Sequence, residues 1–321
     1  MTLATTQPHW DYLASTPDLL VSNLTHLGLI EITGEQGKTF IHGQVTTDIV
    51  SLTEAQWRWG AHCDPKGKMI ASFRTYTIAD SLFVLMPAAV LPLSLASWQK
   101  YAVFSKAELT DISANQVILG FAGTKAADFI EQQFGQISEE VTHIDASIIL
   151  KDGDRFMVIS SSEKAQQLVT ASTQPLTSSQ PWQALEILSG YANIDDKHSS
   201  EFVPQMCNLQ AVNGISFEKG CYMGQETIAR MKYRGGNKRA LYIVSGSASE
   251  KVSSDTQLEL VTDDGFLRAG KVLESVEHNG QVLMTAVLAN DTQADAKLRV
   301  KDDCQSELII VQLPYSLEEK T

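Results

Sequence analysis

After Gly235 and Gly236 the sequence changes to short apolar runs separated by turns, and this pattern constrains the fold more than any other feature. We expect six strands here, over residues 240–246, 256–262, 266–274, 282–289, 296–301 and 307–313. Asn279-Gly280, between two of these runs, is a strong hairpin signal because a type I′ turn needs two residues at positive φ. Several short strands at this spacing predict a small antiparallel β-barrel or sandwich.

The preceding part of the chain mixes predicted strands with predicted helices. We expect strands over residues 27–34, 80–87, 116–123 and 154–161, helices over 88–103, 124–135 and 163–172, and a short helix with a loop in 35–49. The order lacks the regular βαβ rhythm of a doubly wound sheet, so the predicted fold class is α+β. We place the boundary between this α+β region, residues 1–236, and the barrel, residues 237–321, at the paired glycines.

Composition and charge exclude several classes of protein. The 321 residues are 43% hydrophobic and 20% charged, as in ordinary globular proteins. A net charge of −13 argues against wholesale coating of nucleic acid, although one basic patch can still recognise an anion. The N-terminus lacks the pattern of a signal peptide, and no apolar run approaches the ~20 residues of a membrane span. We therefore expect a cytoplasmic protein with no membrane partner.

Common catalytic and metal-binding motifs are missing from the sequence. It contains no G-x-S-x-G, H-E-x-x-H or G-x-G-x-x-G pattern. The four cysteines, Cys63, Cys207, Cys221 and Cys304, are scattered and lack the spacing of a zinc finger. We therefore expect no bound metal and a reducing compartment.

Residues 219–239, "KGCYMGQETIARMKYRGGNKR", form a basic stretch in this acidic chain. The stretch holds six cations and one acid, a local net charge of +5. A helix over Thr227–Tyr233, with Glu226 in its first turn and cations toward its end, has the charge order that a helix dipole favours. That accounts for part of the pattern, but not for Lys219, Lys238 and Arg239. The stretch either meets an anion or stabilises a helix end.

Cys221 lies close to the start of this predicted helix. Helix N-termini and nearby lysines such as Lys219 favour the thiolate form of cysteine, so a reactive thiol and a small buried structural cysteine are about equally supported. Gly220 and Gly224 bracket the thiol, as expected where the backbone turns tightly or approaches a ligand. The amide of Gln225 and the carboxylate of Glu226 together suit a ring with mixed donors and acceptors.

"KGCYMGQE", residues 219–226, resembles the signature K-G-C-[FY]-x-G-Q-E of the YgfZ family of folate-binding proteins, relatives of the glycine-cleavage T-protein (aminomethyltransferase). The resemblance extends through residues 202–241 and to "HCDPKGKM" at 62–69, "KYAVFSK" at 100–106 and "LPYSLEE" at 313–319. It implies two interleaved, ferredoxin-like or T-protein-like α+β subdomains around a central folate-binding opening, plus a C-terminal antiparallel β-barrel.

The resemblance also implies function. It implies tetrahydrofolate as the cofactor and a role in maintaining iron–sulfur enzymes, including those that methylthiolate tRNA. Cys221 is then the presumed functional thiol. One of two family tryptophans associated with folate matches Trp182, and Leu27 stands at the position of the other. Lys219, Gln225, Glu226 and Arg230 complete the predicted folate-binding residues, the cations of this stretch suiting a glutamate tail, a phosphate or the acidic face of a partner.

Two departures from the family pattern bear on mechanism. Leu188 stands where many members carry a glutamate that can bond a pterin edge, and Glu186 would point elsewhere. Ala71 and Ser72 stand where T-proteins carry a catalytic aspartate, and acid–base catalysis needs a carboxylate near the substrate nitrogen. We therefore predict an accessory protein rather than an enzyme. The alternatives are a folate-dependent one-carbon transferase and a direct tRNA-binding module.

Overall fold

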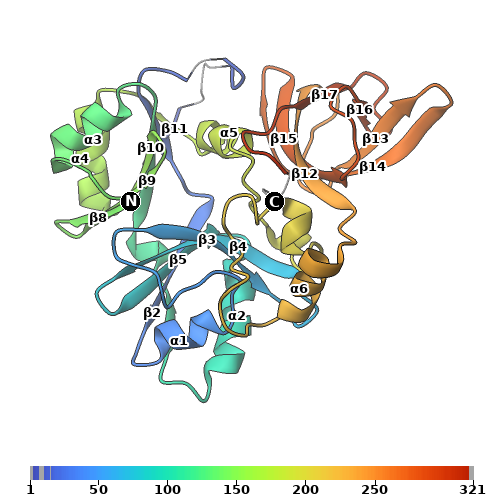
Figure 1. Cartoon of the computed structure of the whole chain (residues 1–321). Helices are drawn as coiled ribbons and strands as arrows, with labels where there is room; N and C mark the ends of the chain where they lie inside the picture. Colours follow the sequence, from blue (N-terminus) through green and yellow to red (C-terminus); the bar gives the residue numbers. More distant parts are fainter. Residues whose placement is uncertain (1–2, 7–10, 15, 318–321) are drawn as a thin grey trace. The chain divides into compact units, whose positions relative to one another are not determined.

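A computed structural model describes residues 3–6, 11–14 and 16–317 (Figure 1). The contacts within the chain divide it into two units that are interleaved in sequence. The first unit comprises Met1–His42, Asp48–Arg58 and Phe73–Trp182, and the second comprises Gly43–Thr47, Trp59–Ser72 and Gln183–Thr321. The boundary predicted after residue 236 lies inside the second unit, just before the first strand of the barrel.

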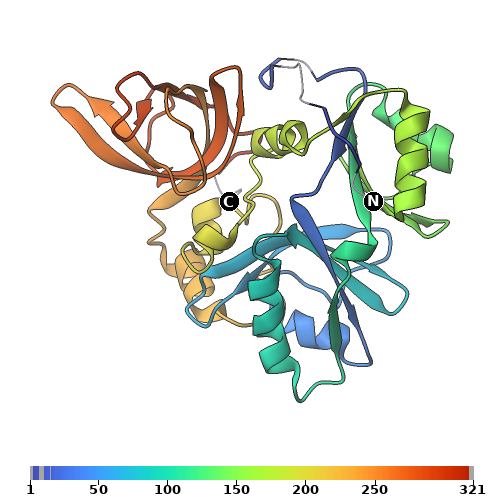
Figure 2. The same ribbon diagram turned by 180° about the vertical axis from the view of Figure 1, so that it is seen from behind.

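The first unit contains a six-stranded sheet in the order β11-β1-β7-β10-β9-β8. Its strands are β1 (Leu20–Asn23), β7 (Val117–Ala122), β8 (Val141–Ile144), β9 (Ser147–Asp152), β10 (Arg155–Ser160) and β11 (Leu176–Thr177). Helices α3 (Ala126–Phe134) and α4 (Ser162–Ser172) lie on one face of it, as Figures 1 and 2 show. They bury Phe129, Ile130 and Leu168 against Phe121 and Val158 of the sheet.

A second sheet has the order β3-β4-β5-β2-β6. Its strands are β2 (Leu27–Thr33), β3 (Trp57–Cys63), β4 (Met69–Ile78), β5 (Ser81–Pro87) and β6 (Glu108–Asp111). Helices α1 (Gly37–His42) and α2 (Leu91–Ala102) contact β2. Helix α2 begins beside Pro92, whose fixed φ suits a first helical turn. Strands β3 and β4 each carry residues of both units, so the chain passes between the units within these two strands as well as elsewhere.

A closed barrel in the order β12-β15-β14-β13-β16-β17 forms the C-terminal part of the second unit. Its strands are β12 (Arg239–Ser247), β13 (Gln257–Thr262), β14 (Gly265–His278), β15 (Gln281–Ala289), β16 (Lys297–Val300) and β17 (Glu307–Val311). The six strand pairings in it are antiparallel, and Asn279 (φ 51°) and Gly280 (φ 73°) make the β14–β15 turn. The predicted barrel and its hairpin are therefore confirmed.

Helical turns and loops complete the second unit. They include η2 (Asp196–His198), η3 (Pro204–Cys207) and α6 (Gln225–Arg234), while α5 (Gln180–Leu188) begins in the first unit and continues into the second. The strands β1, β3, β4, β6, β8, β9 and β11 and the helix α5 were not predicted from the sequence. The mixture of helices, sheets and a closed barrel confirms the predicted α+β class. No helix in the described part of the chain combines the length and the apolar character needed to cross a membrane.

Candidate functional site: the Cys221 segment and the Trp182 cluster

Residues 203–238, which we call the Cys221 segment, carry the signature motif between η3 and β12. Lys219 holds its central loop: its Nζ donates to the backbone oxygens of Val45 (2.7 Å) and Thr47 (3.0 Å). The same ammonium lies 4.9 Å from the ring centroid of Tyr222, which is buried. Lys219 therefore fixes the loop to a stretch of backbone more than 170 residues earlier in the chain.

Two glycines let the turn at residues 64–67 pack directly on the start of α6. Gly67 (φ 78°) and Gly224 (φ 80°), the N-cap of α6, both have left-handed backbones. A Cβ at Gly67 would lie 2.8 Å from the Gly224 oxygen, and one at Gly224 would lie 2.6 Å from the Asp64 oxygen. Only glycine combines a left-handed backbone with such a close approach. The turn at residues 64–67 and the start of α6 therefore pack together as one structural element.

Cys221 is exposed on the loop held by Lys219. Gly220 before it is also exposed and would meet no atom within 4 Å even with a side chain. Cys63 and Cys207, in contrast, are buried in the core of the same unit, and burial raises the pKa of both thiols. Of the two interpretations of Cys221, the buried structural cysteine is therefore wrong, and an accessible thiol is found.

The remaining predicted residues of this stretch lie along α6. Gln225 Oε1 accepts a hydrogen bond from the Tyr222 backbone N–H (3.2 Å), which closes the turn directly after Cys221. Glu226 and Arg230 are exposed on the first turns of the helix. Arg234 and Lys238 are exposed as well. These four charged side chains are thus accessible to a ligand.

The Trp182 cluster lies in the first unit, at the start of α5. The indole is fully buried, and it packs so closely on Gly120 of β7 that a Cβ there would collide with the ring. The Arg155 guanidinium lies 5.3 Å from the indole centroid and donates to Asp152 at 2.8 Å. Arg74 lies 3.5 Å from the same carboxylate. Trp182 therefore borders a buried cluster of two arginines and an aspartate.

The Trp182 indole N–H is buried, and no described residue accepts a hydrogen bond from it. Buried indole N–H groups usually find an acceptor, because leaving one unpaired costs about 1–3 kcal/mol. Leu27 belongs to the same unit, where it begins β2 opposite Pro87 and is buried. The residues predicted to bind folate are thus divided between the units, with Trp182 and Leu27 in the first.

A pair of glutamates forms a polar site that sequence reasoning missed. Asn193 Nδ2 donates to both Glu186 (2.9 Å) and Glu274 (3.0 Å), and Gln183 Nε2 donates to the other Glu274 oxygen at 3.0 Å. Burial, reinforced by the charge of Glu186, raises the pKa of Glu274 to about 8. The signal in the sequence that could have found this site is Glu274, an acid directly after the apolar residues of β14 at 272–273.

Sequence comparisons identify the family of this chain. A sequence model of the YgfZ β-barrel domain matches residues 237–303. The tRNA-modifying protein YgfZ of Yersinia enterocolitica is 40% identical over 310 residues, covering 94% of each chain. The same protein of Yersinia pestis is 39% identical with the same coverage. The chain belongs to the YgfZ family.

The fold of this YgfZ-family chain is also found in a solved enzyme structure. The glycine cleavage system aminomethyltransferase T of Bartonella henselae matches it with a TM-score of 0.70, covering 94% of this chain and 88% of that one. At 14% sequence identity the match shows a shared fold and no more. The predicted T-protein-like fold is therefore confirmed.

Residues 71 and 72 have a structural role in this YgfZ-family chain. Both are buried in β4. Ser72 Oγ donates to the Ala192 oxygen (2.5 Å) and accepts from the Ile194 N–H (3.0 Å). Since Ala71 has no polar group and the Ser72 hydroxyl is engaged with the backbone, neither position supplies a carboxylate for acid–base chemistry.

Proposed function

We propose that this chain binds tetrahydrofolate and acts as an accessory protein that maintains iron–sulfur enzymes, and through them supports the methylthiolation of tRNA. The tRNA-modifying names of its relatives and the fold shared with aminomethyltransferase T support this direction. We place this role in the cytoplasm, a reducing compartment that suits the free cysteines of the chain.

The folate proposal rests on the buried Trp182 N–H, which has no acceptor in the part of the chain that the structure describes. A reduced pterin with its aminobenzoylglutamate chain offers carbonyl and ring acceptors for this donor, and Arg155 and Arg74 suit its anionic groups. Leu27 would add apolar surface, without the stacking that a tryptophan gives. Because the indole is fully covered, binding would require a neighbouring side chain to move aside.

In the second unit, Cys221 is the proposed functional thiol. Thiolates are the usual protein ligands of iron–sulfur clusters, and a thiol releases its proton on binding metal. An exposed sulfur on a loop fixed by Lys219 suits transient contact with the cluster of a client enzyme. The exposed Glu226 and Arg230 would then face the partner, and Gln225 would keep the loop closed.

A one-carbon transferase is the less favoured enzymatic alternative. Its acid–base step needs a carboxylate that Ala71 and Ser72 do not supply. We therefore propose a non-enzymatic role, in which folate acts as an effector or a structural ligand.

A direct RNA interface is favoured by one specific feature of α6. Tyr233 is 71% exposed, and the exposed side chains of Arg230, Arg234 and Lys238 surround it in sequence. Exposed aromatic rings among cations stack bases and neutralise phosphates. Titration of tRNA at two salt concentrations tests it: wild type should bind more weakly at high salt, and Tyr233→Ala should weaken binding by about 1–3 kcal/mol.

Anaerobic calorimetric titration of tetrahydrofolate tests the folate proposal. The sharpest variant is Trp182→Phe, which keeps an aromatic ring but removes the N–H. Trp98→Phe, at another fully buried tryptophan of the same unit, is the matched control. We expect wild type and Trp98→Phe to bind and Trp182→Phe to bind at least about fivefold more weakly, the loss of one hydrogen bond. Equal affinity in all three, or no binding by wild type, contradicts the proposal.

A further inference from the structure

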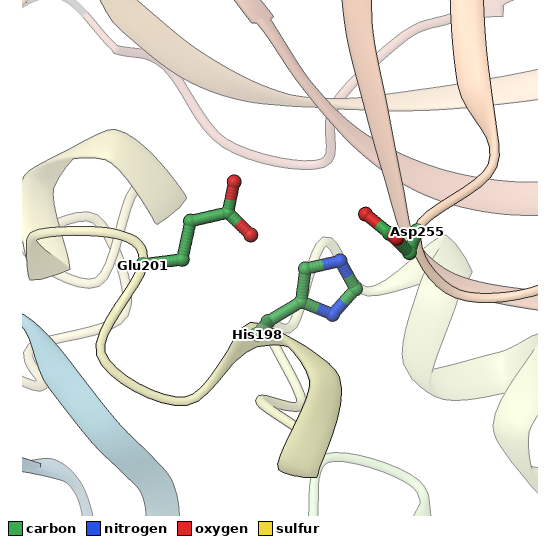
Figure 3. A group of neighbouring side chains, drawn as sticks. All are labelled: His198, Glu201 and Asp255. Carbon is green, nitrogen blue, oxygen red and sulfur yellow. The ribbon is translucent and has the colours of Figure 1, made fainter.

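His198, Glu201 and Asp255 converge in the second unit, outside the signature motif (Figure 3). His198 ends η2, Glu201 follows three residues later, and Asp255 precedes β13 with a left-handed backbone (φ 76°). One ligand atom from each residue lies within 4.8 Å of the others. In Figure 3 the imidazole lies between the two carboxyl groups, with one ring nitrogen directed toward them.

His198 is oriented in the way that metal-binding histidines usually are. Its Nδ1 lies 2.8 Å from Asp195 Oδ1, and its ring is fully buried. Its Nε2 is buried and has no hydrogen-bond partner among the described residues. A carboxylate on one imidazole nitrogen fixes the tautomer and leaves the lone pair of the other nitrogen for a metal. The unpaired nitrogen is therefore an independent indication of a missing ligand.

Lys271 is the competing cation in this cluster. Its Nζ lies 2.9 Å from Glu201 Oε1 and 2.7 Å from Asp255 Oδ1. The hydrogen bond from Lys271 is the main cause that holds the pKa of Asp255 below its ordinary value. These ion pairs satisfy the two carboxylates, but the ammonium makes no hydrogen bond to His198 Nε2, whose lone pair has no donor among the described residues. The ion pairs alone thus do not account for the cluster.

We propose that His198, Glu201 and Asp255 bind one divalent transition-metal ion of the zinc class, in competition with the ammonium of Lys271. One imidazole and two carboxylates suit zinc or a neighbouring first-row metal better than Mg²⁺, which prefers an all-oxygen shell. The ion would neutralise both carboxylates, and Lys271 would keep its proton and move outward into solvent. Three protein ligands leave a fourth position for water.

Zinc titration by calorimetry tests this site in the full chain. The background is Cys221→Ser with Cys304→Ser, which removes two exposed thiols that would compete for zinc. We expect one Zn²⁺ per chain and little response to Mg²⁺. Asp255→Asn should weaken zinc binding at least about 10-fold, as should Asp195→Asn through the orientation of His198. Asp264→Asn, at an exposed aspartate of the β13–β14 turn, is the control and should bind like the background.

Lys271→Gln distinguishes a metal site from a purely structural ion-pair network. Removing the competing ammonium should tighten zinc binding several-fold, while thermal melting without metal should show a less stable protein, because two carboxylates lose their partner. The proposal is overturned if the background binds no zinc, if Asp255→Asn and Asp264→Asn bind it equally, or if Lys271→Gln weakens the binding.

Discussion

The barrel and the Cys221 segment are neighbours in sequence, yet they are stabilised in different ways. The barrel closes through continuous antiparallel ladders around apolar residues such as Val244, Leu258 and Met284. The Cys221 segment has only a 3₁₀ turn and α6, and polar side chains tie its loops to distant backbone: Asn208 to Leu241, Gln205 to Ile228 and Lys219 to Val45. The barrel thus combines strand ladders with an apolar core, whereas the Cys221 segment, which also buries apolar residues such as Leu209 and Ile228, fixes its loops with side-chain hydrogen bonds.

The largest expected effect concerns the apolar core of the barrel. Leu258→Ala removes a fully buried side chain from the barrel core and should lower the free energy of unfolding by about 2–5 kcal/mol. Leu267→Ala in β14 is the control, since Leu267 is exposed and should cost less than about 0.5 kcal/mol. Denaturant unfolding measures both variants. Equal losses would mean that burial does not govern barrel stability.

The second largest expected effect concerns the hydrogen bonds that hold the Cys221 segment. Asn208 Nδ2 donates to the Leu241 oxygen (2.8 Å), and its Oδ1 accepts from the Leu241 N–H (3.2 Å). Asn208→Ala leaves both buried backbone groups unpaired and should cost about 1–3 kcal/mol in denaturant unfolding. Asn115→Ala, at an exposed asparagine, should be nearly neutral. A neutral Asn208→Ala would show that the segment does not depend on this hydrogen-bonded pair.

A third prediction concerns the pH dependence of stability that Glu274, a buried acid in a barrel strand, should cause. Its folded pKa, about 8, lies above its ordinary 4.5, so the folded chain holds the proton more tightly than the unfolded chain. This contribution to stability is present below pH 4.5 and is lost as the pH rises through about 8.

Glu274→Gln should remove that dependence. The wild type should lose up to about 1.4 kcal/mol per pH unit within this window relative to the variant. Denaturant unfolding at several pH values measures the difference, with Glu277→Gln, at an exposed glutamate of β14, as the control. The same slope in wild type and Glu274→Gln would contradict the shifted pKa.

Local sequence signals sufficed for much of the fold, but not for contacts between distant residues. Alternating apolar strands and Asn279-Gly280 predicted the barrel and its hairpin, because both are read within a few residues. From the sequence, Lys219 was expected to favour the thiolate form of Cys221. In the structure its ammonium instead donates to the backbone oxygens of Val45 and Thr47. The convergence of His198 with Asp255 was equally hidden, because only the folded chain brings η2 beside the loop before β13.

The smallest expected effect on stability belongs to Cys221, because its side chain is exposed. Cys221→Ser should change the free energy of unfolding by less than about 0.5 kcal/mol. Equilibrium denaturation measures this, with Cys304→Ser, also exposed, as the matched control. A large loss of stability would mean that Cys221 has a structural role. The thiol could then not be separated from the residues that hold the segment in place.

The central claim is that the framework of the Cys221 segment exists to present a functional thiol. The most direct test is methylthiolation of tRNA in a bacterial strain that lacks its own member of this family and expresses wild type, Cys221→Ser or Cys304→Ser at equal levels. The account predicts restored methylthiolation with wild type and Cys304→Ser, and none with Cys221→Ser. Normal methylthiolation with Cys221→Ser would contradict it.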